Sequence, residues 1–159
     1  MVPLDLIALL GALGSGLMAG FFFAFSVCVM KALEKLAPEQ GIAAMQSINV
    51  VVINPVFLTV FLGTGGLCAL GILASLMRWQ DPRAAYMIAG GALYLVGSIL
   101  VTMMFNVPRN NALAALAPSS AEGAKLWASY LSSWTAWNHV RTIASLAAAA
   151  LLTMALRFR

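Results

Sequence analysis

Two short polar segments stand out in a chain that is otherwise mostly apolar. Residues 106–110 read Asn-Val-Pro-Arg-Asn, and residues 134–141 read Trp-Thr-Ala-Trp-Asn-His-Val-Arg. An imidazole can act as a general base near neutral pH, and a guanidinium can hold an anion or a polarised carbonyl. Because ionisable side chains are costly near a hydrocarbon region, those found there are candidates for function. These segments therefore contain the candidate chemistry of the chain.

The composition predicts an integral membrane protein. Of the 159 residues, 62% are hydrophobic and 9% are charged, whereas a soluble domain carries about 25% charged residues. The nine basic residues, which give a net charge of +4, are scattered. The lack of a basic cluster argues against a nucleic-acid partner. Contact with anionic lipid headgroups explains the surplus of positive charge. We expect the lipid bilayer as partner, in the bacterial inner (plasma) membrane.

Uncharged runs predict four helices that cross the bilayer, each of which needs about 20 apolar residues. The first three runs are long enough alone. The fourth, 142–156, becomes a span only if its helix begins near Trp134, and Pro108 is expected to end the third span. The prediction is an all-α, integral membrane four-helix bundle, formed by residues 1–159 as one domain, with spans at about 5–30, 50–77, 84–107 and 134–156.

The connections between these spans place the polar residues on one side of the membrane. The turn 78–83 is tight, whereas the connections 31–47 and 109–133 are longer, with a capping-box spacing from Ser119 to Glu122. With four spans, both longer connections lie on the same face. That face collects the candidate site residues: His139, Arg109, Arg141, Asn49, Asn106, Asn110, Trp134, Trp137 and Asn138.

Small residues predict how the helices approach one another. Gly16 and Gly20 are spaced four apart in the first span, and small residues let helix backbones come close in lipid. Packing inside one bundle is the first interpretation, and a homodimer seam is the alternative. Cys28 and Cys68 stand alone in apolar runs, so we expect buried, inert thiols rather than a disulfide or metal site.

Each candidate residue also has a purely structural interpretation. His139 is the only histidine, which argues against a multi-histidine metal site, and it could simply bond a backbone carbonyl. The arginines could extend to lipid headgroups, the asparagines could cap helices, and the tryptophans could form an interfacial belt. Helical spacing places Asn138 and Arg141 on one stripe and His139 on a neighbouring stripe. Their convergence requires a pocket wide enough to touch both.

At these residues the chain resembles the anthrone-oxygenase-like small membrane proteins, a family long catalogued as a domain of unknown function. The resemblance covers nearly the whole chain, and its last two segments are the most specific. The segments that carry it are residues 16–26, 45–49, 54–57, 106–110 and 134–141.

The resemblance implies a four-helix membrane protein and, as in the characterised fungal members, oxidation of an anthrone to an anthraquinone by O2 without metal or flavin. We therefore expect no cofactor and a hydrophobic small-molecule substrate of aromatic or quinol-like type. On this hypothesis His139 is the base, and Arg109 and Arg141 stabilise the enolate oxygen. Asn49, Asn106, Asn110 and Asn138 contact the substrate, and Trp134 and Trp137 stack on its rings.

Three other functions are compatible with these residues. A non-catalytic membrane protein that binds a quinone-like or lipid-like molecule would use the same amides and arginines but would tolerate loss of His139. A proton-coupled transporter would need a carboxylate within the membrane, and none is present, since Asp5 lies at a span edge. A structural membrane subunit would depend on the glycine seams instead.

Overall fold

The computed structural model describes residues 4–158 of the chain, and every regular element in that range is helical. The prediction of an all-α protein is confirmed. Five continuous helices follow one another, two of them containing π-helical stretches. They are α1 (Leu4–Ala24) continued by η1 (Phe25–Val29) and α2 (Met30–Glu34); α3 (Pro38–Val51); α4 (Pro55–Leu76); α5 (Ala84–Tyr94) continued by η2 (Leu95–Leu100), η3 (Thr102–Asn106) and α6 (Val107–Ala114); and α7 (Ala121–Ala155).

Three of these helices are long and apolar enough to span a membrane: Leu4–Glu34, Pro55–Leu76 and Ala84–Ala114. This indicates a membrane protein. The count of four membrane helices is not confirmed, because α7 is not among the helices that meet the criteria for a span. Its middle carries Asn138, His139 and Arg141, which lower its hydropathy. The crossing predicted at 134–156 therefore stays a prediction.

The second predicted span begins later than expected, because the chain breaks between α3 and α4. Val50 and Val51 still belong to α3, and the break lies at Val52–Asn54. Asn54 has an extended backbone and caps α4, its Oδ1 accepting a hydrogen bond from the Phe57 N–H at 3.0 Å. Pro55 follows as the first helical residue, where its missing N–H is harmless.

The expectation that Pro108 ends the third span is wrong, since the helix continues to Ala114. Pro108 lies in the first turn of α6, directly after the π-helical turns of η3. The change from π-helical to α-helical hydrogen bonding at this point accommodates a residue without an N–H. Arg109 then donates from its guanidinium to the Phe105 carbonyl at 2.7 Å.

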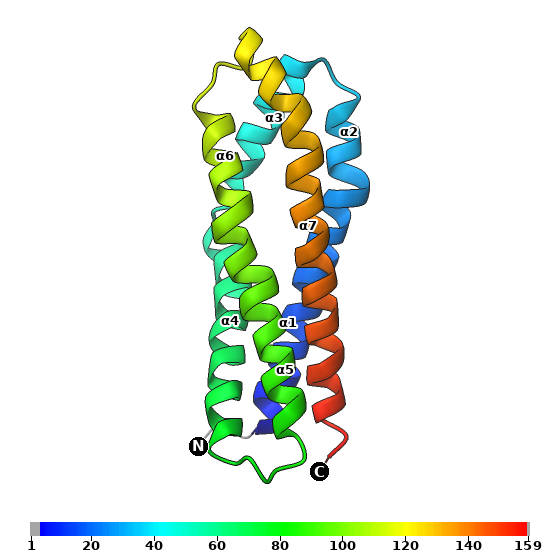
Figure 1. Ribbon diagram of the computed structural model, residues 1–159, viewed down its shortest axis with the longest axis vertical. Helices are drawn as coiled ribbons and strands as arrows, with labels where there is room; N and C mark the ends of the chain where they lie inside the picture. The colour runs from blue at the N-terminus through cyan, green and yellow to red at the C-terminus, as the bar shows by residue number, and fades with distance from the viewer. Residues whose placement is uncertain (1–3, 159) are drawn as a thin grey trace.

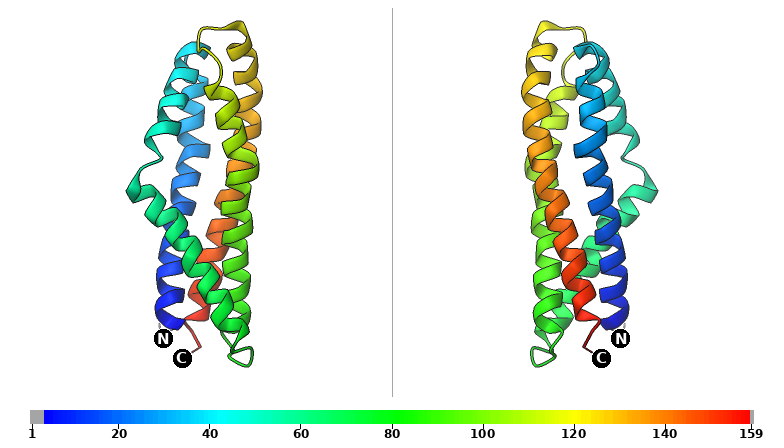
Figure 2. Two further views of the ribbon diagram at one scale, coloured as in Figure 1. Left: turned by 90° about the vertical axis from the view of Figure 1, so that its left-hand side faces the viewer. Right: turned by 90° about the vertical axis from the view of Figure 1, so that its right-hand side faces the viewer.

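The helices form an elongated bundle with both ends of the described chain at one extremity (Figure 1). α1, α4, α5 and the second half of α7 surround the lower half, and α2, α3, α6 and the first half of α7 surround the upper half. The break between α3 and α4 bulges away from the bundle axis (Figure 2). α3 and α4 thus follow each other along one side of the bundle.

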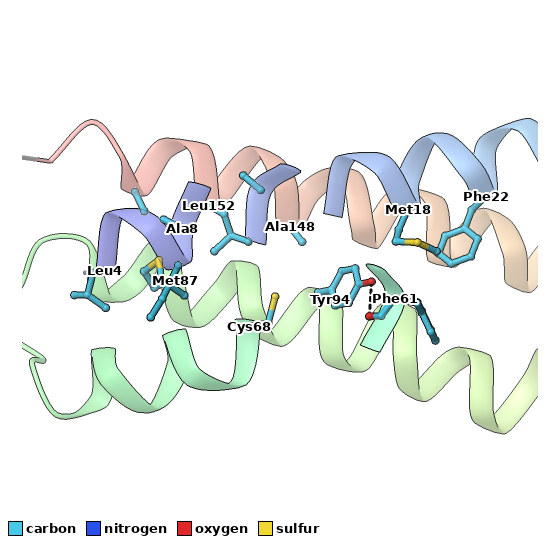
Figure 3. Close-up of a cluster of buried hydrophobic side chains, with 13 residues drawn as sticks. Leu4, Ala8, Met18, Phe22, Phe61, Cys68, Met87, Tyr94, Ala148 and Leu152 are labelled. Carbon is cyan, nitrogen blue, oxygen red and sulfur yellow. Dashed lines mark hydrogen bonds between the residues drawn. The ribbon is translucent and has the colours of Figure 1, made fainter. Parts of the chain in front are cut away.

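Two hydrophobic clusters fill the two halves. The lower cluster includes Phe22, Phe61 and Tyr94, and the Tyr94 hydroxyl donates to the Phe61 carbonyl at 3.0 Å (Figure 3). The upper cluster is built around Ile42 and Met45 of α3 together with three rings of α7. Those rings, Trp127, Tyr130 and Trp134, are buried and stacked in series. They therefore do not form the interfacial belt that their spacing could also have indicated.

The ends of the helices are held by specific polar contacts. Gln46 of α3 donates to the carbonyls of Leu113 and Leu116 at 2.8 and 3.0 Å, at the end of α6. The cap of α7 is Ser120, whose Oγ accepts from the Gly123 N–H, one residue later than the predicted capping box began. At the opposite end of the bundle, Arg83 makes ion pairs of 2.8 Å with both Asp5 and Asp81.

Two sequence expectations about small residues and thiols are only partly met. Gly16 approaches Ala149 of α7, as expected for packing inside the bundle, but a Cβ on Gly20 would meet nothing within 4 Å. Cys68 is buried, whereas Cys28 is exposed on the surface of the described chain, so the prediction of two buried thiols is wrong for Cys28. Its place in η1 puts it on the outer side of the helix, opposite buried Ser26.

Candidate functional site

A layer of buried polar side chains separates the two hydrophobic clusters, and Asn138 of α7 is at its centre. Its Nδ2 donates to the Phe22 carbonyl of α1 and to the Ser26 hydroxyl of η1, at 2.6 Å each. η1 is a π-helical stretch, a rare form that is frequent at functional sites. Asn138 therefore fixes α7 against the first helix at the level where that helix changes its winding.

Arg141 lies one turn further along α7 and is 6% exposed. It donates from Nη2 to Asn138 Oδ1 at 2.6 Å and from Nη1 to Thr102 Oγ1 at 3.1 Å. Its guanidinium carbon lies 4.2 Å from the ring centre of Phe22 and 5.2 Å from that of Trp134, within the range of cation–π attraction. No carboxylate of residues 4–158 pairs with it. Its charge is held only by neutral dipoles and rings.

A cavity of about 280 Å³ adjoins Arg141. Its polar lining comes from three parts of the chain: Asn49 of α3, Thr102, Asn106 and Asn110 of the η3–α6 helix, and Arg141 of α7. The rest of the lining is apolar and rich in aromatic rings. These ring side chains are Phe21, Phe22, Phe25, Phe57, Phe61 and Trp134.

Three buried polar atoms that belong to residues lining this cavity have no hydrogen-bond partner among the described residues. They are two donors, Arg141 Nε and Asn49 Nδ2, and one acceptor, Asn106 Oδ1. Buried polar groups are nearly always paired, so each unpaired one requires an explanation. Free donors and a free acceptor around one space match a ligand that carries both an oxygen acceptor and a hydroxyl.

Asn110 connects this cavity to the upper cluster. Its Oδ1 accepts from the Tyr130 hydroxyl and from Trp134 Nε1, both at 2.8 Å. Asn106 donates from Nδ2 to the Trp134 carbonyl at 3.3 Å. The Trp134 ring is therefore fixed between α6 and α7 and forms a rigid wall of the cavity.

Arg109 and Trp137, which sequence reasoning assigned to the site, do not line the cavity. Arg109 donates from Nε to Ser133 Oγ at 3.1 Å and thereby holds α6 against α7. Trp137 stacks on Phe105, with ring centres 3.6 Å apart and nearly parallel planes. Both residues bind the η3–α6 helix to α7 behind the site.

His139 lies elsewhere. It is exposed and lines a separate surface groove of about 540 Å³ between α2 and α7, together with Lys31 and Glu34. The neighbouring stripes that helical spacing assigned to His139 and Arg141 thus face different spaces. Of the nine residues predicted from sequence, the structure brings together five around the cavity: Asn49, Asn106, Asn110, Trp134 and Arg141.

Sequence reasoning missed several residues of this site. Thr102 contacts the Arg141 guanidinium and bonds back to the Ser98 carbonyl at 2.8 Å. Its spacing of four from Asn106, which in turn precedes Asn110 by four, was the available signal. Phe22 and Phe57 lie in segments that carry the family resemblance, but a phenylalanine in an apolar run does not reveal which face of the helix it occupies.

A second space of about 530 Å³ lies on the outer side of α1, α3 and α4, but its lining is almost wholly apolar. Among residues 4–158, no group of three or more His, Cys, Asp or Glu side chains could hold a metal ion. The cavity at Arg141 therefore has the best-defined chemistry of the described chain.

The fold and site define a class of protein: a helical membrane protein with a buried, cationic, ring-lined site at the junction of two hydrophobic clusters. The family model for anthrone oxygenase matches residues 56–151, which is more than half of the chain, and the protein belongs to that family. The matched region contains Thr102, Asn106, Trp134, Asn138 and Arg141. No curated protein and no solved structure matches the chain.

Proposed function

We propose that this protein is an oxygenase of the anthrone oxygenase type, acting on a flat, hydrophobic aromatic molecule with a ketone and hydroxyl groups. The observation that carries the proposal is the buried Arg141 guanidinium, which has no carboxylate partner among residues 4–158, has an unpaired Nε–H and adjoins a cavity lined by rings. Burying an unpaired charge is costly. An anionic oxygen of the substrate would supply the missing countercharge.

The chemistry follows from the acidity of an anthrone. Loss of a proton from the carbon opposite the ketone gives an enolate, with negative charge shared between that carbon and the oxygen. Arg141 stabilises the oxygen, and a fixed positive charge held where negative charge develops is an effective form of catalysis. The electron-rich carbon transfers electrons to O2 and forms a C–O bond, giving a hydroperoxide after protonation. Loss of the second proton from that carbon breaks the O–O bond, releases water and leaves the quinone carbonyl.

The proposal differs from the sequence hypothesis in the source of the base. No imidazole or carboxylate of the described residues lines the cavity. We therefore propose that water or hydroxide from the solvent removes the proton, and that the protein stabilises the enolate that results. Asn49 Nδ2 donates to a ketone oxygen of the ring system, and Asn106 Oδ1 accepts from one of its hydroxyl groups.

The substrate reaches the cavity from the bilayer. The exposed apolar side chains of Ile53, Met103 and Val107 lie at the rim of the cavity, between the start of α4 and the η3–α6 helix. α4, with 22 residues, is about 33 Å long and matches a hydrocarbon layer of about 30 Å. Its N-terminus therefore marks one membrane surface, and the cavity lies just inside it. On this proposal α7 is the fourth crossing helix, with Asn138 and Arg141 shielded from lipid by the other helices.

Oxygen consumption by purified protein in lipid nanodiscs with anthrone tests the proposal, after subtraction of spontaneous oxidation. Arg141→Gln should lower turnover at least about 100-fold, the loss typical of removing one oxyanion-stabilising donor. The turnover of the matched variant His139→Gln should stay within about twofold of the wild-type value, because His139 lies in a groove separate from the Arg141 cavity. Thermal melting of Arg141→Gln shows whether the protein is still folded. Collapse of turnover in His139→Gln with Arg141→Gln active would reverse the assignment.

Binding without turnover is the second candidate function, favoured because no imidazole or carboxylate of residues 4–158 lines the cavity to accept the substrate proton. Anthraquinone, which cannot be oxidised further in this reaction, distinguishes the two. Quenching of tryptophan fluorescence by anthraquinone, lost in Arg141→Gln, together with no turnover of anthrone by the wild type, would establish a binding protein.

A further inference from the structure

The surface groove at His139 lies outside the proposed oxygenase site and has its own set of charged groups. It runs between α2 and α7, has a volume of about 540 Å³, and is lined by both polar and apolar side chains. The two helices lie side by side at this level (Figure 1). The groove is thus a built feature of the junction of two helices.

The groove collects three groups with complementary chemistry: the Lys31 ammonium, the His139 imidazole and the Glu34 carboxylate. In residues 4–158 none of the three makes a hydrogen bond or an ion pair. Ser132 and Thr135 add hydroxyl groups to the same lining. The groove therefore offers two donors suited to a phosphate and one acceptor suited to an ammonium group.

The groove also lies where the surface changes from apolar to polar. Along the exposed stripe of α7, Ser132 and His139 are followed by Ile143 and Leu146, which are 68% and 61% exposed. Along the first helix, exposed Phe23 lies below Lys31, and it is 56% exposed. Large exposed apolar side chains indicate contact with lipid tails, and charged ones indicate the headgroup level.

We infer that this groove is a binding site for a phospholipid with a primary-amine headgroup, phosphatidylethanolamine being the simplest. Lys31 and His139 donate to the phosphate oxygens, and Glu34 accepts hydrogen bonds from the ammonium group of the same headgroup. The acyl chains extend along Phe23, Ile143 and Leu146 into the bilayer. This assigns His139 to lipid recognition, independently of any oxygenase activity.

The charge arrangement favours this lipid over two others. Phosphatidylcholine carries a quaternary ammonium group that cannot donate a hydrogen bond to Glu34. Phosphatidylglycerol lacks a cation, so it leaves Glu34 without a partner beside an anionic headgroup. Hydrogen bonds to charged groups are among the stronger polar contacts, so the headgroup should decide the affinity.

Native mass spectrometry of delipidated protein, titrated separately with the three lipids carrying identical acyl chains, measures the dissociation constant of the first bound lipid. Phosphatidylethanolamine should bind about tenfold more tightly than phosphatidylcholine. Glu34→Gln should remove that difference. Lys31→Gln and His139→Gln should each raise the dissociation constant of phosphatidylethanolamine about tenfold. Lys35→Gln, an exposed lysine of the same helix end outside the groove, is the matched control and should change nothing.

Two results would overturn the inference. One is equal affinity of the wild type for phosphatidylethanolamine and phosphatidylcholine. The other is displacement of the lipid by inorganic phosphate at similar concentration, which would make the groove a site for free anions. All four substituted residues are exposed, so the variants should fold, and melting curves without added lipid check this. The lipid measurement does not involve anthrone, so its outcome is independent of the proposed oxygenase function.

Discussion

Arg141 carries a permanent charge in a space that contains no countercharge from the described chain, and its neighbours determine where that charge points. Asn138 holds one nitrogen, Thr102 holds a second, and two aromatic rings cover the faces. The third nitrogen, Nε, stays free. The direction of that free N–H is therefore set in part by Asn138, which does not itself line the cavity.

Asn138→Ala tests this positioning role. The substitution removes the hydrogen bonds to Phe22, Ser26 and Arg141 and leaves their buried partners unpaired, which should cost about 2–3 kcal/mol of stability. Turnover of anthrone should fall mainly through kcat, with KM changed less, because the ring-lined cavity persists while the charge moves. Ser26→Ala removes only one of these bonds and should cost about 1 kcal/mol. Equal effects of the two variants on kcat would contradict the positioning role.

The ion pairs that Arg83 makes with Asp5 and Asp81, at the end of the bundle far from the upper cluster, predict that stability depends on pH. Hydrogen bonds from Arg83 lower the pKa of Asp81 to about 2 from 3.8. The folded state thus binds a proton less readily than the unfolded chain, so this contribution to stability is present above about pH 4 and is lost as the pH falls through about 2. Because the pair is near the surface, we expect at most about 1 kcal/mol. Melting temperatures of Asp81→Asn should show less decline over this range than those of the wild type.

Residue types and spacing were enough to find the polar layer but not its geometry. The amides, Trp134 and Arg141 could be predicted to share one level of the bundle because the connections alternate between two faces. Whether His139 faces the cavity or the surface could not be predicted, because that depends on which stripe of α7 faces the other helices. Asn54 shows the opposite case: an asparagine before a proline indicates a cap from local rules alone, and it is one.

At the scale of elements, glycines decide how closely the helices approach. A Cβ on Gly91 of α5 would lie 3.0 Å from the Cys68 carbonyl of α4 and 2.9 Å from Ile72. Gly91→Ala should therefore destabilise the protein by about 1–2 kcal/mol, since a backbone atom cannot move aside easily. Gly20→Ala is the matched helical control, because nothing lies within 4 Å of its Cβ position. It should be neutral or slightly stabilising, as alanine favours helix. Thermal melting in one detergent compares both, and equal shifts would contradict this packing.

The element boundaries show which structural features local rules can predict. The uncharged runs predicted helices at about 5–30 and 84–107, but neither the continuation of these helices to Glu34 and Ala114 nor the π-helical stretches within them. η1 and η3 contain Ser26 and Asn106, which face the polar layer. Their altered winding depends on partners across the bundle, so no sequence pattern within one helix indicates it. The same applies to Pro108, whose effect depends on the winding just before it.

For the whole molecule, helix length determines what lies outside the bilayer. α7 has 35 residues and is about 52 Å long, well beyond a hydrocarbon layer of about 30 Å. We therefore expect its first half, with α2, α3 and α6, to project into water. In a Cys28→Ala background, Ser129→Cys, exposed and outside the His139 groove, should react quickly with a membrane-impermeant maleimide added to both sides of the membrane. Leu146→Cys, equally on the outer surface of the bundle, should not react, because lipid covers it.

The labelling pair also tests the fourth span. Rapid reaction at Leu146→Cys would show that α7 lies outside the bilayer. Composition predicts the membrane class of the molecule. The number of crossings could not be derived from hydropathy, because the α7 residues that we assign to the candidate site are those that lower its hydropathy. The upper cluster was also not predicted, since nothing in the sequence showed that three rings of α7 pack on α3.

The marginal hydropathy of α7 has a consequence for how the chain becomes embedded. A helix with a central arginine is disfavoured in lipid by a few kcal/mol when it is alone. The groups that accept the Asn138 and Arg141 protons, the Phe22 carbonyl, Ser26 and Thr102, come from helices made earlier. α7 is thus synthesised after these helices, and its insertion as a crossing helix would need them already assembled to receive it. On the proposal that α7 is the fourth crossing helix, completion of the membrane topology and assembly of the cationic site are a single event in the biogenesis of this protein.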